Sequence, residues 1–226
     1  MNAFHKNIPD KTFETLNHQG EFTRLAVSPG IINKHYTPTQ FQKIAEIVGE
    51  KGAIKYSASY SILLSIPSSE LTEAMHALQE AGLFVAPSGS SHIAMKACDF
   101  CDGEKMEAVP QTEQLYHALD GITVPARVRV NVNGCASACY NPTFDDIGLV
   151  YQHESFDVYL GAIPMGAKAQ AGTLFAKRVG VHHIEGFLLQ IIRLYQEQAR
   201  SNEPFYKFYR RTKSNDDWEQ VKKLID

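Results

Sequence analysis

The chain has 226 residues, of which 44% are hydrophobic and 21% are charged, a composition that is ordinary for a globular protein. Its net charge of −3 excludes a general basic field for nucleic acid, and no stretch approaches the ~20 apolar residues that span a membrane. The first residues lack the apolar core of a signal peptide, so we expect a cytoplasmic protein with no nucleic-acid or membrane partner.

The first ninety residues predict an arm followed by alternating strands and helices. Residues 1–20 are polar and show no apolar period, so we expect a loose arm there. Strands are predicted at 22–32 and 53–67, and helices at 37–52 and 68–82. The alternation predicts a sheet with helices on one face.

The ends of the two helices carry recognisable signals. Thr37 is a candidate N-cap with Pro38 at the first helical position, and Gly52 is expected to end the first helix. Ser68 or Ser69 is expected to cap the second helix.

The second half of the chain predicts a further helix, a set of strands and a helical end. A strictly alternating strand is expected at 124–134, and two apolar strands that form a hairpin are expected at 146–152 and 156–163. Helices are expected at 112–121 and 180–200, and the tail from residue 202 predicts one or two short helices.

Four cysteines stand in two close pairs and are the only cysteines of the chain. Cys98 and Cys101 form C-x2-C, and Cys135 and Cys139 form C-x3-C after 33 intervening residues. Since reducing cytosol disfavours disulfides, two such pairs predict a four-thiolate shell for zinc or a [4Fe–4S] cluster. The interval holds a predicted helix and strand, which favours a folded cluster domain over a small zinc ribbon. Zinc and thiol redox chemistry stay open.

The residues beside the second pair indicate a tight turn. Asn133 and Gly134 allow the backbone to turn sharply at the end of a strand, so a thiolate can approach a bulky ligand. The small residues at 136–138 allow close packing against that ligand. A simple tight turn would account for the same residues.

The segment around the second pair resembles a known family. The stretches "RVRVNVNGCASAC", "DDIGLVYQ" and "FDVYLGAI" resemble the cofactor-binding segment of sirohaem-dependent sulfite and nitrite reductases, and the residues before them resemble the ferredoxin-like half-domain of that family. The resemblance implies an α+β fold with a ferredoxin-like half-domain at 21–90 and a [4Fe–4S]/sirohaem-binding α/β domain at 91–200. A helical tail follows at 201–226, and the whole is similar to small single-module members.

The resemblance also implies a set of cofactor ligands. All four cysteines would ligate a [4Fe–4S] cluster, and Cys139 would also bridge to the iron of sirohaem. Asn133 and Gly134 would lie at the cofactor, and Lys168 could partner a sirohaem carboxylate.

Basic side chains would surround a small oxyanion substrate in that family. The positions implied here are Arg24, Arg127, Arg129 and Lys96, which would neutralise the anion and supply protons. Two arginines at i and i+2 are equally typical of any strand with one wet face, and Arg24 can be an ordinary surface charge.

Several residues depart from the family pattern. The first pair is usually C-x5-C, and Glu104 stands where its second cysteine would fall. The second pair reads Cys-Ala-Ser in place of Cys-Pro-Asn, and "SASY" at 57–60 replaces a segment that carries an arginine. These departures weaken the case for sulfite reduction more than the case for a cluster. A single module also lacks the half that completes the haem pocket, so we expect a homodimer.

These observations lead to three hypotheses. The first is an oxidoreductase, a sirohaem and [4Fe–4S] reductase of sulfite, nitrite or a similar small oxyanion. Because no G-x-G-x-x-G fingerprint is present, its electrons would come from a separate electron-donor protein. The second is a non-catalytic iron–sulfur protein for electron transfer or tetrapyrrole binding. The third is a zinc-stapled interaction domain.

Overall fold

The computed structural model describes residues 21–57, 60–88 and 91–224, which form two compact units that divide between residues 89 and 90. The predicted arm at 1–20 lies outside the described residues. Both units mix helices with a sheet, so the predicted α+β class is confirmed. In the described part of the chain, every helix is too short or too polar to cross a membrane.

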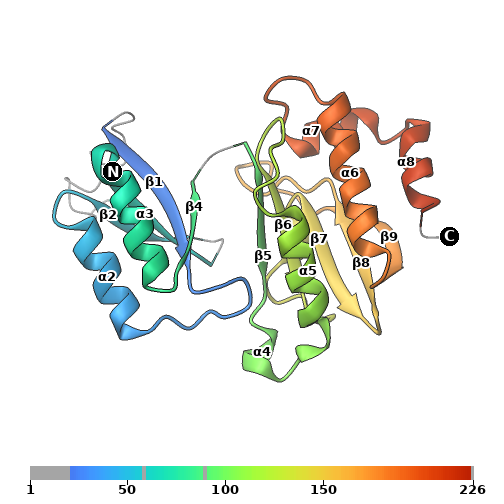
Figure 1. Ribbon diagram of the computed structural model, residues 1–226. Helices are drawn as coiled ribbons and strands as arrows, with labels where there is room; N and C mark the ends of the chain where they lie inside the picture. The colour runs from blue at the N-terminus through green and yellow to red at the C-terminus, as the bar shows by residue number, and fades with distance from the viewer. Residues whose placement is uncertain (1–20, 58–59, 89–90, 225–226) are drawn as a thin grey trace. The chain divides into compact units, whose positions relative to one another are not determined.

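The first unit is an antiparallel sheet with two helices on one face (Figure 1). Its strands run in the order β2-β3-β1-β4, and both β2 and β4 are edges. The strands are β1 (Phe22–Ser28), β2 (Ala53–Tyr56), β3 (Ile62–Pro67) and β4 (Phe84–Pro87). The helices are α2 (Pro38–Val48) and α3 (Leu71–Glu80), the second preceded by the 3-10 turn η2 (Ser68–Glu70).

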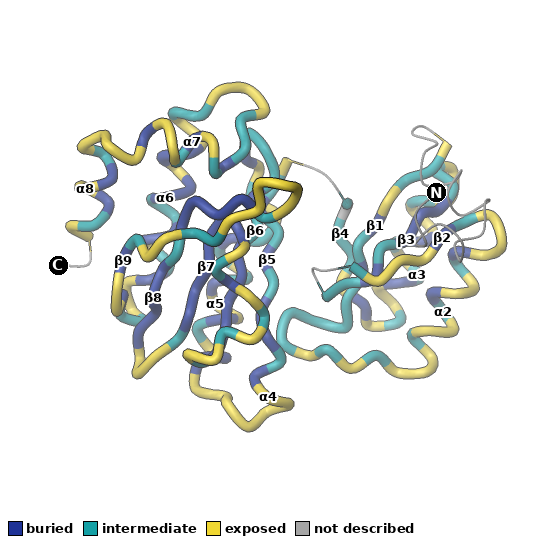
Figure 2. The backbone as a smooth tube through the Cα atoms, turned by 180° about the vertical axis from the view of Figure 1, so that it is seen from behind, coloured by how far each residue is buried: buried dark blue, intermediate teal, exposed yellow. Residues whose placement is uncertain are grey.

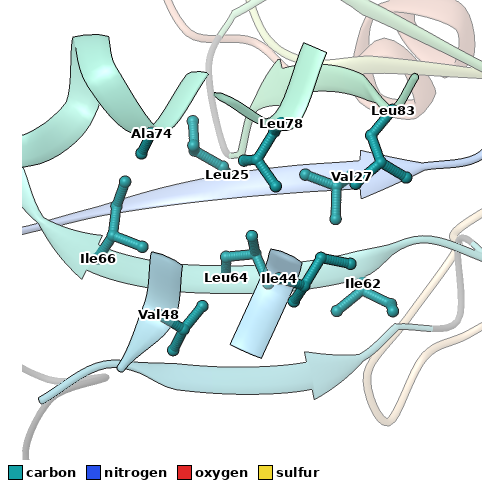
Figure 3. Close-up of a cluster of buried hydrophobic side chains, with 10 residues drawn as sticks. All are labelled: Leu25, Val27, Ile44, Val48, Ile62, Leu64, Ile66, Ala74, Leu78 and Leu83. Carbon is teal, nitrogen blue, oxygen red and sulfur yellow. The ribbon is translucent and has the colours of Figure 1, made fainter. Parts of the chain in front are cut away.

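Alternating side chains of the strands form the core of this unit with the two helices (Figure 3). Leu25 and Val27 on β1 pair in register with Leu64 and Ile62 on β3, so all four point to the helices. The cluster comprises Leu25, Val27, Ile44, Val48, Ile62, Leu64, Ile66, Ala74, Leu78 and Leu83. Burial of these side chains is the main force that holds the helices on the sheet.

The structure confirms the start of α2 and corrects its end. The Thr37 hydroxyl accepts the N–H of Gln40, and the Gln40 side chain accepts the N–H of Thr37, which forms a capping box. The helix ends at Val48, because Gly49 takes a positive φ of 56° and turns the chain. Gly52, which was expected to end it, lies three residues further on.

Two further predictions for this unit are wrong. The single strand predicted at 53–67 is a hairpin of β2 and β3, closed by a hydrogen bond from Ser57 N–H to Ser61 O at 2.9 Å. Neither Ser68 nor Ser69 caps α3 through its side chain; they belong to the 3-10 turn that leads into the helix.

The second unit is a five-stranded mixed sheet in the order β5-β6-β7-β8-β9. The first three strands are parallel, and the last two are antiparallel to their neighbours. They are β5 (Ile93–Ala97), β6 (Val128–Asn133), β7 (Ile147–Gln152), β8 (Ser155–Leu160) and β9 (Thr173–Gly180). Helices α5 (Val109–Leu119) and α6 (Ile184–Gln198) lie on one face of this sheet. Figure 2, which views the molecule from behind, shows that most residues of the central strands are buried.

Short elements complete the second unit. The predicted β7–β8 hairpin is confirmed, and its turn residues His153 and Glu154 both have positive φ, as a tight hairpin turn requires. The remaining elements are α4 (Phe100–Gly103), η3 (Met106–Ala108), η4 (Pro142–Phe144), α7 (Phe205–Thr212) and α8 (Asp216–Lys222). Helices α7 and α8 pack on α6, with Trp218 buried between aromatic rings of α7 and β9.

Candidate metal centre

Both cysteine pairs emerge from the same edge of the second sheet. Cys98 directly follows β5, and Cys135 follows β6 after one glycine. Because β5 and β6 are parallel neighbours, their carboxyl ends meet at one edge, where parallel sheets commonly bind ligands. We call residues 98–105 the first cysteine loop and residues 134–146 the second cysteine loop.

The first cysteine loop is a short turn with an unusual backbone. Cys98 is buried whereas Cys101 is exposed. Phe100, Cys101 and Asp102 all have φ between 53° and 54°, a left-handed region that non-glycine residues seldom occupy. Asp99 supports the turn, because its Oδ1 accepts the N–H of Cys101 at 3.0 Å.

Gly134 joins the two loops at their inner side. Its N–H donates to the sulfur of Cys98 at 3.2 Å. A Cβ at this position would lie 2.6 Å from the ring of Phe100, which is itself buried. The residue is therefore glycine because the first loop packs directly against its Cα.

Tyr140 joins the two loops at their outer side. Its hydroxyl donates to Asp99 Oδ2 at 2.9 Å, which links the residue after Cys139 to the residue after Cys98. Its backbone N–H donates to Asn133 Oδ1 at 3.1 Å, and its carbonyl accepts Asn131 Nδ2 at 2.8 Å. Both asparagines are buried on β6, so they fix Tyr140 to the sheet.

The second cysteine loop folds back over the sheet face opposite the helices. Gly148 of β7 has no room for a Cβ, which would overlap the carbonyl of Pro142 in the loop. Beneath the loop, Lys96 Nζ lies 2.9 Å from Asp145 Oδ2, which also accepts Asn131 Nδ2 at 2.8 Å. Asp145 and Asn131 are buried and Lys96 is half-buried, and their mutual contacts can hold the loop in one place.

The four thiols share one electrostatic neighbourhood. None is in a disulfide. Burial raises the pKa of Cys98, whose sulfur is stabilised as thiolate by the N–H groups of Gly134 and Phe100 and opposed by Cys139. The pKa of Cys101 is raised by desolvation and then by Cys135, Asp99 and Cys139. Across 21–57, 60–88 and 91–224, no three His, Cys, Asp or Glu side chains stand close enough to share a single ion.

Two of the basic residues implied by the resemblance lie toward the far end of β6 from the thiols. Arg127 directly precedes β6 and Arg129 is its second residue, about 20 Å and about 13 Å respectively along the chain from the cysteine end of the strand. Arg129 faces Asp146, with Nη1 to Oδ2 at 3.8 Å and its own N–H donating to the same oxygen at 2.9 Å. The Nε of Arg127 is buried without a hydrogen-bond partner.

The other implied residues have different surroundings. Lys96 is in the ion pair with Asp145 under the second loop. Lys168 is exposed on a tight loop closed by mutual backbone hydrogen bonds of Ile163 and Gln170. Arg24 is exposed on β1 of the first unit.

The residues that the sequence analysis missed are those that join the loops. Asp99, Tyr140, Asn131 and Asp145 carry most of the hydrogen bonds at the site. The sequence did carry a signal for Asn131. It alternates with the valines of a strand that ends directly before the second cysteine pair. Nothing in the spacing of Asp99 and Tyr140 distinguishes them from ordinary loop residues.

Comparison with known proteins gives the class and then the family of this site. Residues 91–220 match the family model of the nitrite and sulphite reductase 4Fe-4S domain. The matched segment contains both cysteine loops and the whole second sheet. The chain therefore belongs to this family of 4Fe-4S domains, which supports an iron–sulfur cluster.

Two curated relatives match most of the chain. The chain is 40% identical over 190 residues to the cobalt-factor III methyltransferase of Priestia megaterium, covering 84% of this chain and 35% of that protein. It is 26% identical over 158 residues to the uncharacterised protein MJ0551 of Methanocaldococcus jannaschii, covering 68% of this chain and 56% of that protein. The chain thus spans about a third to just over half of these relatives.

Solved structures share the fold at low sequence identity. Dissimilatory sulfite reductase I superposes with a TM-score of 0.67 and 11% identity, covering 90% of this chain and 69% of that one. The NirA protein of Mycobacterium tuberculosis superposes with a TM-score of 0.68 and 9% identity, covering 90% of this chain and 40% of that one. At these identities the likeness concerns the fold alone.

Proposed function

We propose that this chain is an iron–sulfur protein that holds a [4Fe–4S] cluster on Cys98, Cys101, Cys135 and Cys139 and works on or with a metal-containing tetrapyrrole. The observation that carries the proposal is the hydrogen bond from Gly134 N–H to the sulfur of Cys98. It brings the start of the second pair against the first pair, which lies 37 residues earlier by sequence number.

The donor set fits a cluster. Four free thiols from two loops match the four-thiolate ligation of [4Fe–4S] centres. The inner sulfur accepts backbone N–H groups, and hydrogen bonds of this kind are known to tune cluster potentials. When bound, such a cluster supplies electron transfer, while the chain holds its ligands and controls their exposure.

The exposure of the thiols supports a second cofactor or substrate outside the cluster. Cys139 and Cys101 are exposed, whereas Cys98 is buried. The residues at 136–138 are small, so a bulky planar molecule can approach Cys139 closely. The resemblance implies sirohaem there, and the name of the Priestia relative specifies cobalt-factor III as the compound that it methylates.

Methyl transfer is not part of this proposal. The chain covers 35% of the Priestia protein, so that activity can reside in the remainder. The unit that carries the cysteines would instead bind a metal-containing tetrapyrrole or transfer electrons to it. An electron-donor protein is then the expected partner.

Reduction of sulfite, nitrite or a similar oxyanion by bound sirohaem is the second candidate. One observation favours it: Arg127 keeps a buried Nε with no hydrogen-bond partner, beside Arg129. These arginines lie at the far end of β6 from the thiols, so they would serve a site completed by a second copy of the chain. The proposed homodimer follows from that requirement.

Metal analysis of protein purified without oxygen tests the proposal. We expect about four iron atoms and four sulfides per chain and a visible spectrum that disappears in Cys98→Ser. Stoichiometric zinc without sulfide would overturn the proposal in favour of the zinc-stapled domain.

Titration with sirohaem and with its cobalt analogue tests the tetrapyrrole. Either compound should change the electron paramagnetic resonance spectrum of the reduced cluster. Sulfite and nitrite turnover of the sirohaem-loaded protein, lost in Arg127→Ala with Arg129→Ala, would favour the second candidate. A cluster that responds to neither compound would leave an electron-transfer protein without a tetrapyrrole.

A further inference from the structure

We propose that Tyr140 is a positioning residue for the cluster, and that its hydroxyl acts through Asp99 to hold the two outer thiols, Cys101 and Cys139, at a fixed separation. The inference rests on the proposed cluster and deepens it. It concerns the geometry of the ligands before and after the metal is bound.

The four thiols divide into an inner and an outer pair. Cys98 is buried and Cys135 is half-buried, and Gly134 ties them by its N–H bond to the Cys98 sulfur and by its packing on Phe100. Cys101 and Cys139 are exposed. Contacts of Gly134 cannot fix this outer pair, because Cys101 and Cys139 lie further along each loop.

One carboxylate connects the outer pair. Asp99 Oδ1 accepts the backbone N–H of Cys101 at 3.0 Å, and Asp99 Oδ2 accepts the hydroxyl of Tyr140 at 2.9 Å. Tyr140 directly follows Cys139 in the chain. Both bonds have an ionised acceptor, and bonds of that kind are stronger than those between neutral groups.

Tyr140 is the fixed side of this connection. Asn133 and Asn131 hold its N–H and its carbonyl, and both asparagines are buried in the central strand β6. The first loop is the dependent side, since residues 101–107 are all exposed. Through its hydrogen bond to Asp99, the phenol of Tyr140 therefore fixes the turn that carries Cys101 relative to the sheet.

Tyr140→Phe removes the hydroxyl and keeps the ring. We expect a bathophenanthroline-type iron chelator to extract iron from the anaerobic variant about tenfold faster than from the wild type, as the loss of one charge-assisted hydrogen bond predicts. The Fe–S stretching bands of the resonance Raman spectrum should shift as well. The melting temperature should fall by only about 2–4 °C, because the backbone anchors remain.

Tyr206→Phe is the matched control. Tyr206 is also half-buried and lies on α7, which Figure 1 shows at the end of the second unit away from α4 and the first cysteine loop. Its variant should release iron at the wild-type rate. Asp99→Ala should act like Tyr140→Phe or more strongly, and adding Tyr140→Phe to it should have no further effect if both act through one bond.

A measurement without metal separates this inference from the proposed function. In a Cys98→Ser, Cys135→Ser background, a short bifunctional maleimide should bridge Cys101 and Cys139, and Tyr140→Phe should lower the yield severalfold. Equal yields and equal iron release in the two forms would overturn the role of Tyr140 while the cluster stands. If the wild type bound no iron, the proposed function would fall, and the bridging yield would still decide the inference.

Discussion

The two cysteine loops leave the same sheet edge but are held in different ways. The second loop lies over the sheet, with buried partners on β5, β6 and β7. The first loop is exposed beyond Phe100 and is held by one buried ring, one sulfur contact and one carboxylate. The comparison teaches that the second loop is part of the folded core, whereas the first is positioned by the second.

Gly148→Ala should have the largest effect on stability, because it displaces the second loop. The added Cβ would overlap the carbonyl of Pro142, and neither backbone segment can move without displacing the second loop. We expect the free energy of unfolding to fall by about 3 kcal/mol, near the upper end for overpacking, with loss of iron. Urea unfolding and iron content measure both effects.

Gly186→Ala is the control for that change. Gly186 lies inside α6, and a Cβ there would meet nothing within 4 Å. We expect a gain of roughly 0.5–1 kcal/mol from the better helix propensity of alanine. Equal effects at both glycines would contradict the close approach of the second loop to β7.

Lys96→Met should show how far the second loop depends on the ion pair of half-buried Lys96 with buried Asp145. The change leaves Asp145 buried with Asn131 as its remaining described partner, and we expect a loss of about 2–3 kcal/mol in urea unfolding. Lys96→Met combined with Asp145→Asn should restore part of that loss. A variant as stable as the wild type would show that the pair does not hold the loop.

Gly134→Ala should affect the contact between the loops more than the fold. The new Cβ meets the Phe100 ring, a side chain that can yield in part, so we expect a loss of about 1–2 kcal/mol. Phe100→Leu in the same chain should recover some stability. Iron release should be faster in Gly134→Ala, and an unchanged rate would argue against a shared inner contact.

Asp146, the last residue of the second loop, should give a smaller effect that depends on pH. Burial raises the pKa of its carboxyl from 3.8 to about 6. The folded state therefore binds this proton more tightly than the unfolded state, so its stabilising contribution is present below about pH 4 and is lost as the pH rises through 6. The expected slope is at most about 1.4 kcal/mol per pH unit.

Asp146→Asn should remove that slope and keep the acceptor for the Arg129 N–H. Urea midpoints of both proteins between about pH 4 and 7 give the difference curve. A flat difference curve would mean that the carboxyl stays ionised throughout.

Local signals in the sequence predicted elements with clear ends, and these are confirmed. The capping box at Thr37 and the β7–β8 hairpin are of this kind. Strands β4, β5 and β9 were not predicted, because β4 is short, and because β5 and β9 are the edge strands of their sheet and carry the charged residues Lys96, Lys177 and Arg178. The parallel pairing of β5 with β6 joins distant segments, so no local pattern could show it.

The sequence predicted the four cysteines of the site but not the residues that hold the two cysteine loops in place. The alternation of residues in β6 placed Arg129 and Asn131 on one face of the strand. A strand with one solvent-exposed face would show the same pattern. That face is covered by the second loop, so Asn131 is fully buried and serves as a donor to the loop. A sequence pattern shows which residues share a face of a strand. It does not show that residues 9 and 14 positions after Asn131 fold back and cover that face.

The attachment of both thiol-bearing segments to ends of adjacent parallel strands has an evolutionary consequence. Residues 101–107, which begin at the second cysteine of the first loop, are all exposed, so this solvent-facing stretch is the part of the two loops that can most readily change in length. Insertions and deletions there leave strand register and hydrophobic packing untouched. Lineages could thus retune access to the proposed cluster by changing the length of one surface segment while inheriting the same scaffold.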